Sequence, residues 1–193
     1  TDDVGRYSSI TIGADGLGLI SYYDEFNQSL KLAHCSNTNC TGSTNGQWDT
    51  NPNVGSYTSI TIGADGLGLI SYYDAANSAL KVAHCSDTDC MNPTLTTLDS
   101  GVAGSYTSIT IGADGLGLIS YQQRGDFGSP DYISVAHCND TNCTSATKTK
   151  LDSTGVVGQY TSITIGADGL GLISYYDWNN NENLKVAHCE NAF

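Results

Sequence analysis

Apolar and polar residues alternate along a segment that recurs four times in this chain with little change. In the second copy, residues 57–63 (YTSITIG) place Ile60 and Ile62 on one face of an extended strand, because successive side chains of a strand point to opposite sides. Residues 64–66 (ADG) then predict a tight turn, since Asp-Gly supplies the backbone conformations that a hairpin requires. The period of two, interrupted by Gly and Thr, predicts β-strands and no helix.

Each copy continues into three further predicted strands. Residues 67–73 (LGLISYY) are apolar on both faces, as expected for a strand that is covered on both sides. Residues 80–85 (LKVAHC) predict a third strand, with Leu80 and His84 on the same side. Residues 94–99 (TLTTLD) predict a fourth strand, which is shorter and more polar. Four antiparallel strands in about 50 residues correspond to one blade of a β-propeller.

The four copies start near the same tyrosine and are offset by 50, 49 and 54 residues. These tyrosines are Tyr7, Tyr57, Tyr106 and Tyr160. A repeat of this length is typical of a propeller or a solenoid, and a β-solenoid would need shorter coils. We therefore predict an all-β fold, a four-bladed β-propeller with the first strand of each blade along the axis and the fourth at the rim. The expected single domain spans residues 1–193, with repeats at approximately residues 4–53, 54–102, 103–156 and 157–193.

The last repeat is truncated in this sequence. Cys189 is followed only by residues 190–193 (ENAF), so the second cysteine and the fourth strand of the repeat are missing. An open sheet edge is a template for pairing with another chain, and an odd cysteine in a secreted protein indicates an intermolecular partner. We therefore expect Cys189 to be a candidate intermolecular thiol. The alternative is a short, protected edge with a buried free cysteine.

The charge of the chain excludes several classes of partner. Lys and Arg total 7 against 20 acidic residues, which gives a formal net charge of −13. Nucleic-acid binding needs a basic footprint, and anionic membranes repel such a chain. No apolar run approaches the length of a membrane span. We expect no nucleic-acid partner and no membrane insertion.

The cysteines indicate an oxidising compartment. Three repeats carry a Cys-x4-Cys pair, and such pairs in a chain with polar loops favour disulfides. The predicted bonds are Cys35–Cys40, Cys85–Cys90 and Cys138–Cys143. The alternative is a metal site at each His-Cys dipeptide, but adjacent residues of a strand point to opposite faces. With no signal peptide visible, the chain is cytosolic or already processed, and the cysteines favour a secreted, extracellular or cell-surface protein. Candidate glycosylation sites are Asn27, Asn39, Asn139 and Asn142.

Two sets of repeated carboxylates are candidates for cation binding. The first set occupies the turn after the first strand, and in a propeller it would form a ring around one mouth of the axis: Asp15, Asp65, Asp114 and Asp168. Oxygen ligands of this kind suit Ca²⁺, although Asp-Gly is also simply the residue pair that this turn requires. The second set has an Asn three residues later, and Asx turns explain it equally well: Asp24, Asp74 and Asp177. No cofactor is required by either interpretation.

No catalytic set is visible in the sequence. A nucleophile, base and acid must be distinct residues in one place, whereas the titratable residues here are evenly distributed copies. The predicted role of the four repeated histidines is packing between blades and hydrogen bonding: His34, His84, His137 and His188. We therefore expect that the chain is not an enzyme.

The segments SYTSITIGADG and ISYYD followed by LKVAHC resemble the repeats of secreted prokaryotic tandem-repeat β-propeller-like surface proteins. The resemblance covers all four repeats. It implies an extracellular or surface-attached protein, and some tandem-repeat surface proteins build fibres. It implies no settled biochemical activity, and no functional residue follows from it.

Our leading hypothesis is a non-enzymatic structural protein whose copies assemble head to tail into a surface fibre or sheath through the incomplete last blade. A head-to-tail contact that does not close produces a filament. The alternative hypothesis is a lectin-like propeller that binds carbohydrate weakly at one site per blade, where avidity compensates for weak individual sites. Its sites would use the Asp and Asn turns together with the tyrosine pairs Tyr22/Tyr23, Tyr72/Tyr73 and Tyr175/Tyr176. Such tyrosines more often fill the wedge between blades, with the hydroxyl at the rim.

Overall fold

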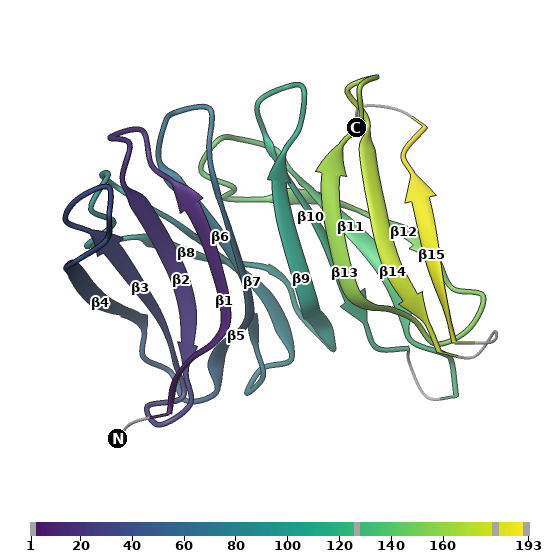
Figure 1. Ribbon diagram of the computed structural model, residues 1–193. Helices are drawn as coiled ribbons and strands as arrows, with labels where there is room; N and C mark the ends of the chain where they lie inside the picture. The colour runs from purple at the N-terminus through teal and green to yellow at the C-terminus, as the bar shows by residue number, and fades with distance from the viewer. Residues whose placement is uncertain (1–2, 126–127, 179–181, 191–193) are drawn as a thin grey trace.

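The computed structural model describes residues 3–125, 128–178 and 182–190, and these contain 15 β-strands in four antiparallel sheets. Three sheets have four strands and the last has three. No helix in these described ranges is long and apolar enough to cross a membrane. The all-β prediction is confirmed, and each repeat forms one sheet, which we call blades 1 to 4 in chain order (Figure 1).

Within each blade the strands pair with their neighbours in chain order. Blade 1 contains β1 (Val4–Ile12), β2 (Gly18–Asp24), β3 (Ser29–Cys35) and β4 (Ser43–Asp49). Blade 2 contains β5 (Val54–Ile62), β6 (Gly68–Asp74), β7 (Ala79–His84) and β8 (Thr94–Asp99). Blade 3 contains β9 (Ala103–Ile111), β10 (Gly117–Gln123), β11 (Tyr132–Cys138) and β12 (Ala146–Asp152). Blade 4 contains β13 (Val157–Ile165), β14 (Gly171–Asp177) and β15 (Asn183–His188).

The blades stand side by side in an arc, with blade 1 and blade 4 at its two ends (Figure 1). The first strands pack on one another in sequence, β1 on β5, β5 on β9 and β9 on β13. The fourth strands β4, β8 and β12 form the outer edges of their sheets and are largely exposed. The structure thus has the expected order of strands from the axis to the rim.

The apolar core lies between blades rather than within them. We call the face of a blade that packs on the preceding blade its leading face, and the opposite side its trailing face. Between blades 1 and 2, Leu30 and Leu32 of the trailing face pack with Val54 and Ile60 of the leading face, and all four are buried. Equivalent clusters join blades 2 and 3 and blades 3 and 4. Burial of one such side chain contributes roughly 1.5–3 kcal/mol, so these interfaces supply most of the core.

A glycine at the start of each inner strand lets neighbouring blades approach closely. Gly55 has a φ of +104°, and a Cβ placed there would lie 2.6 Å from the Leu30 Cα of the preceding blade. Gly104 and Gly158 repeat this geometry at the next two junctions. A side chain here would both strain the backbone and push the blades apart.

The three predicted disulfides are present, joining Cys35–Cys40, Cys85–Cys90 and Cys138–Cys143. Cys189 is free and buried, in the cluster between blades 3 and 4. Burial raises the pKa of its thiol, which lowers the fraction of reactive thiolate. This position favours the buried-thiol alternative, and an intermolecular bond through Cys189 stays a prediction.

We expect Gly55→Ala to lower the free energy of unfolding by about 2–5 kcal/mol, because left-handed backbone strain and overpacking add. Gly5→Ala is the matched control: Gly5 has a φ of +97°, but nothing lies within 4 Å of the position that a Cβ would occupy there. Its replacement should therefore cost only the backbone strain, about 1–2 kcal/mol. Urea unfolding of dilute protein measures both values, and equal losses would contradict the close packing at Gly55.

Candidate functional site

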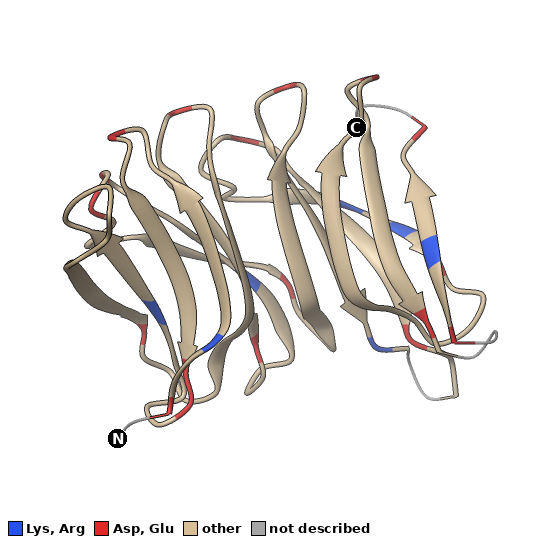
Figure 2. Cartoon of the chain, in the orientation of Figure 1, with Lys and Arg blue, Asp and Glu red and all other residues tan. Residues whose placement is uncertain are grey.

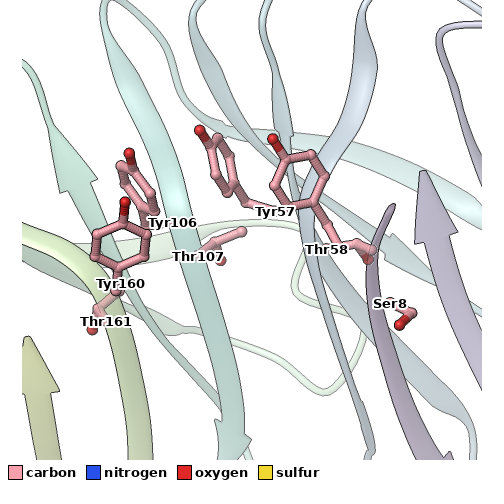
Figure 3. Close-up of a pocket in the computed structure, with 8 residues that line it drawn as sticks. Ser8, Tyr57, Thr58, Tyr106, Thr107, Tyr160 and Thr161 are labelled. Carbon is pink, nitrogen blue, oxygen red and sulfur yellow. The ribbon is translucent and has the colours of Figure 1, made fainter. Parts of the chain in front are cut away.

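Four tyrosines from the four innermost strands gather around one open pocket of about 250 Å³. They are Tyr7, Tyr57, Tyr106 and Tyr160. Figure 3 shows the rings of Tyr57, Tyr106 and Tyr160 with their hydroxyls pointing the same way. Centroids of neighbouring rings lie 4.6, 4.5 and 4.8 Å apart along the series. Hydroxyl groups complete the lining, contributed by Ser8, Thr58, Thr107 and Thr161. The pocket therefore offers aromatic faces and neutral hydrogen-bonding groups.

Each pocket tyrosine sits at a break in its strand. The φ angles of Tyr7, Tyr57, Tyr106 and Tyr160 are 53°, 55°, 52° and 53°, a left-handed conformation that a bulky side chain rarely adopts. The register shifts at the same point of each inner strand, as at a β-bulge. Bulges re-aim side chains, and strained residues of this kind cluster at binding and active sites. The sequence pattern did not reveal the bulge, because the segment alternates regularly through it.

The two middle tyrosines of the pocket, Tyr57 and Tyr106, have raised phenol pKa values. Burial raises the pKa of Tyr57, and the neighbouring phenols of Tyr106 and Tyr7 raise it further. Burial likewise raises the pKa of Tyr106. None of the described residues that line the pocket carries a charge. The pocket is thus built to donate and accept hydrogen bonds without a formal charge.

The tyrosine pairs predicted as sugar platforms have other roles. In blades 2 and 4 the first member is interior: the hydroxyl of Tyr72 donates to Asp49 Oδ2 at 3.0 Å, and that of Tyr175 donates to Asp152 Oδ2 at 2.9 Å, each aspartate on the preceding blade. In blade 1, Tyr22 is half-buried and lines an open pocket. The second member packs against a pocket tyrosine, with the ring centroids of Tyr73 and Tyr57 at 6.2 Å. The tyrosine pairs therefore do not form one exposed sugar-binding surface on each blade.

The turn carboxylates pair with the repeated histidines instead of with one another. In each turn one carboxylate oxygen accepts the N–H of the leucine two residues later, at 2.9–3.1 Å. The other oxygen lies 2.8 Å from a histidine Nε2 of the same repeat. The pairs are Asp15–His34, Asp65–His84, Asp114–His137 and Asp168–His188. Figure 2 shows acidic residues at the tips of these loops, along one edge of the arc.

These pairs bear on the expected Ca²⁺ ring. Within the described residues no group of three or more His, Cys, Asp or Glu side chains could hold a metal ion. The four turn carboxylates are therefore not brought together as ligands of one site. Ca²⁺ binding at this edge of the molecule stays a prediction.

The second carboxylate set stabilises turns and blade contacts. Asp24 accepts the backbone N–H of Asn27 at 2.9 Å, which is the Asx turn that the sequence suggested, and it pairs with Lys31 at 2.5 Å. Sequence reasoning missed a partner set, the aspartate that ends each fourth strand. Asp49 is buried, accepts from Tyr72 and pairs with Lys81 of the next blade. An aspartate recurs at this position of each complete repeat, and that recurrence was the sequence signal that could have revealed the set.

The candidate glycosylation sites are all exposed. Two of their side-chain amides already donate hydrogen bonds: Asn27 Nδ2 donates to Asp24 at 2.7 Å, and Asn139 Nδ2 to Ser145 at 3.0 Å. Asn39 and Asn142 lie in the Cys-x4-Cys loops. Glycosylation at these positions stays a prediction.

No family model and no curated protein matches the chain. Solved structures do share its fold. A protein of unknown function from Dyadobacter fermentans is 16% identical, with a TM-score of 0.73, and the match covers 93% of this chain and 51% of that one. An α-L-arabinanase from Penicillium chrysogenum in complex with arabinobiose is 11% identical, with a TM-score of 0.69 over 98% of this chain and 63% of that one. An α-L-arabinofuranosidase from Fusarium graminearum is 10% identical, with a TM-score of 0.61 over 96% of this chain and 61% of that one.

The chain spans about half of the Dyadobacter protein's length. At these identities the likeness shows the fold alone, and it supports the propeller-like arrangement that the repeats resemble. The same neighbours overturn two predictions. The fibre-subunit role and the absence of enzymatic activity are both contradicted, because the fold neighbours include glycoside hydrolases.

We expect stability to fall in acid as the Asp24 carboxylate is protonated. Burial alone would raise the pKa of Asp24, but hydrogen bonds from Lys31 and Asn27 outweigh it and lower the pKa to about 2. Since the unfolded value is about 3.9, this group stabilises the fold above that pH, and the contribution is lost as pH falls toward the folded pKa. Urea unfolding between pH 7 and 2 measures the loss. In Asp24→Asn the decrease below pH 4 should be shallower, and an unchanged slope would contradict the assignment.

Proposed function

We propose that this chain is a secreted protein that binds carbohydrate, and that the tyrosine pocket is its binding site. The observation that carries the proposal is the set of four tyrosines held in left-handed backbone around one pocket. Left-handed backbone costs about 1–2 kcal/mol per residue. Such strain persists only where the surrounding structure holds the residue in place, and it is concentrated at functional sites. The three disulfides support the extracellular location, since such bonds persist in oxidising compartments.

The chemistry of the pocket suits a sugar. Aromatic rings pack against the C–H faces of a pyranose or furanose, while tyrosine and threonine hydroxyls exchange hydrogen bonds with the sugar hydroxyls. Pockets of this type combine apolar walls with a few placed polar groups. The fold neighbours support the class of ligand, since one of them is an arabinanase whose structure contains arabinobiose.

The ligand that fits best is a neutral, short oligosaccharide. No charged side chain lines the pocket within the described part of the chain, so nothing there would pair with a sulfate or a carboxylate. The net charge of −13 also repels anions at long range. A volume of about 250 Å³ is below the ~300–1,000 Å³ of drug-sized sites, and it suits one or two sugar units.

Hydrolysis is the second candidate activity, because the fold neighbours include an arabinanase and an arabinofuranosidase. Glycoside hydrolysis ordinarily uses two carboxylates on either side of the scissile bond. The described lining of the pocket contains hydroxyls and aromatic rings but no carboxylate. Binding is therefore the activity that the pocket geometry supports best, and release of reducing ends is measured alongside it.

We expect isothermal titration calorimetry with neutral arabino-, xylo- and galacto-oligosaccharides to show binding to the full chain. Tyr160→Ala should weaken it about fivefold to tenfold, since one aromatic contact contributes about 1–1.5 kcal/mol. Tyr160 is 69% exposed, so its removal leaves the blades folded. Tyr160→Phe, which keeps the ring, should retain most of the affinity.

Phe26→Ala is the matched control, because Phe26 is an exposed aromatic residue in the turn between β2 and β3, outside the pocket. Its affinity should equal that of the wild type. Binding that is lost equally in both variants, or binding to none of the sugars, would overturn the tyrosine pocket as the site. Release of reducing ends that survives Tyr160→Ala would place a catalytic site elsewhere.

A further inference from the structure

The third repeat departs from the other three at the end of its second strand. Where the other repeats have Tyr-Tyr-Asp, residues 121–123 are YQQ. The connection that follows, from β10 to β11, is also longer than the turns from β2 to β3 and from β6 to β7. Because the four repeats are otherwise nearly identical, a difference confined to blade 3 indicates a role that this blade has alone.

Gln122 takes the place of the second tyrosine of the pair. In the other three blades this tyrosine packs on a pocket tyrosine, with ring centroids 6.2 or 6.3 Å apart. Gln122 is buried instead, and its Nε2 donates to the Val157 carbonyl of blade 4 at 3.1 Å. A smaller, polar side chain therefore occupies a position where the other blades have an aromatic ring.

A second pocket, of about 60 Å³, lies at this position between blades 2 and 3. We call it the blade-3 pocket, and its lining includes Tyr73, Ser78, Ser105, Gln122, Arg124 and Asp131. It adjoins the tyrosine pocket, because Tyr73 packs on Tyr57 and Ser105 directly precedes Tyr106. In Figure 3 the hydroxyls of Tyr57 and Tyr106 point away from the threonines that follow them, toward the start of their strands. The blade-3 pocket lies at this same end of the blades.

Arg124 brings an unpaired positive charge to the blade-3 pocket. Of the seven basic residues in the chain, five pair with carboxylates and Lys150 lies over the ring of Tyr132. The exposed guanidinium of Arg124 has no such partner among the described residues. Its N–H groups are therefore free to donate hydrogen bonds to a ligand.

Asp131 supplies the opposite charge in the same pocket. Its Oδ1 accepts the Gly125 N–H at 3.2 Å, and its carbonyl accepts the Val157 N–H at 3.1 Å, so its position is fixed. A carboxylate only accepts hydrogen bonds and a guanidinium only donates them, whereas a hydroxyl does both. Asp131 would repel an anionic ligand group and Arg124 a cationic one. The pair thus fits a neutral hydroxyl.

The backbone at the blade-3 pocket is strained. Val102, which also lines the pocket, has a φ of 74°, a conformation that is a genuine outlier for a β-branched residue. Its N–H donates to the Ser78 carbonyl at 2.9 Å, and its carbonyl accepts the Arg124 N–H at 2.8 Å. Strain of this kind is concentrated at functional sites, and here it holds two pocket residues in place.

The size of the blade-3 pocket limits what it can hold. A water molecule occupies about 30 Å³ in the liquid, so about 60 Å³ accommodates a group of roughly two heavy atoms and excludes a sugar ring. The exocyclic hydroxymethyl group of a hexose has this size and ends in a hydroxyl. A pentopyranose lacks the group.

We propose that the blade-3 pocket is a subsite that takes the hydroxymethyl group of a hexose unit next to the unit held by the tyrosines. Gln122, Arg124 and Asp131 then select hexose over pentose oligosaccharides. This inference rests on the carbohydrate binding proposed above and names the class of sugar. The four repeated tyrosines offer similar walls and cannot by themselves orient a ligand, whereas blade 3 breaks their symmetry.

Isothermal titration calorimetry of the full chain with cellotriose and xylotriose tests the subsite. The two sugars share linkage and ring hydroxyls and differ in the hydroxymethyl groups. Cellotriose should bind about tenfold more tightly, the effect of one hydrogen bond to a charged group. A β-galactosyl disaccharide and its α-L-arabinopyranosyl counterpart form a second pair with the same difference.

Arg124→Ala should reduce the ratio of hexose to pentose affinity to about one. Lys150→Ala, which removes an exposed cation outside both pockets, should keep the wild-type ratio. Gln122→Tyr restores the residue that the other three blades have at this position, so the blade should fold. Its larger side chain should fill the blade-3 pocket and abolish the hexose preference.

The outcomes separate the subsite from the tyrosine pocket. Equal binding of both members of a pair, weakened by Tyr160→Ala, would overturn the hexose subsite and leave the tyrosine pocket in place. A hexose preference that persists in both Arg124→Ala and Gln122→Tyr would also overturn the subsite. Binding to none of the sugars would overturn both proposals.

Discussion

The close approach of neighbouring blades is the constraint on which the rest of the molecule depends. A single sheet cannot bury its own apolar side chains, so the leucines of one blade are buried against the next blade. This burial requires a glycine where the backbones of two blades approach each other, as at Gly55 against Leu30. The same approach brings the inner strands near enough for Tyr57 to contact Tyr7 and Tyr106. The apolar core and the tyrosine pocket thus both result from the close spacing of neighbouring blades.

Local pattern was enough to predict the strands and their order. Residues 94–99 were expected as a fourth strand, and β8 spans Thr94–Asp99. Alternation and Asp-Gly turns are local signals, which the sequence carries within a few residues of each element. The disulfides followed for the same reason, because a Cys-x4-Cys pair closes a short loop.

What the sequence did not reveal depends on contacts between blades. The bulge at Tyr57 interrupts no visible pattern, so its ring was read as an ordinary strand residue rather than a pocket wall. Tyr72 was expected either to stack on a sugar or to fill the wedge between blades, and its partner Asp49 could not be identified because it lies on the preceding blade. The fibre role rested on a truncated last repeat, and fold neighbours that act on carbohydrates contradict it.

Identical junctions also have an evolutionary consequence. Because the trailing face of every blade fits the leading face of any other, duplication or deletion of one repeat in the gene requires no compensating mutation at a new contact. Recombination between such similar repeats changes their number readily, and every added copy brings its own tyrosine to the inner wall. Copy number would then set how many tyrosines line the inner wall, without a change to any single side chain.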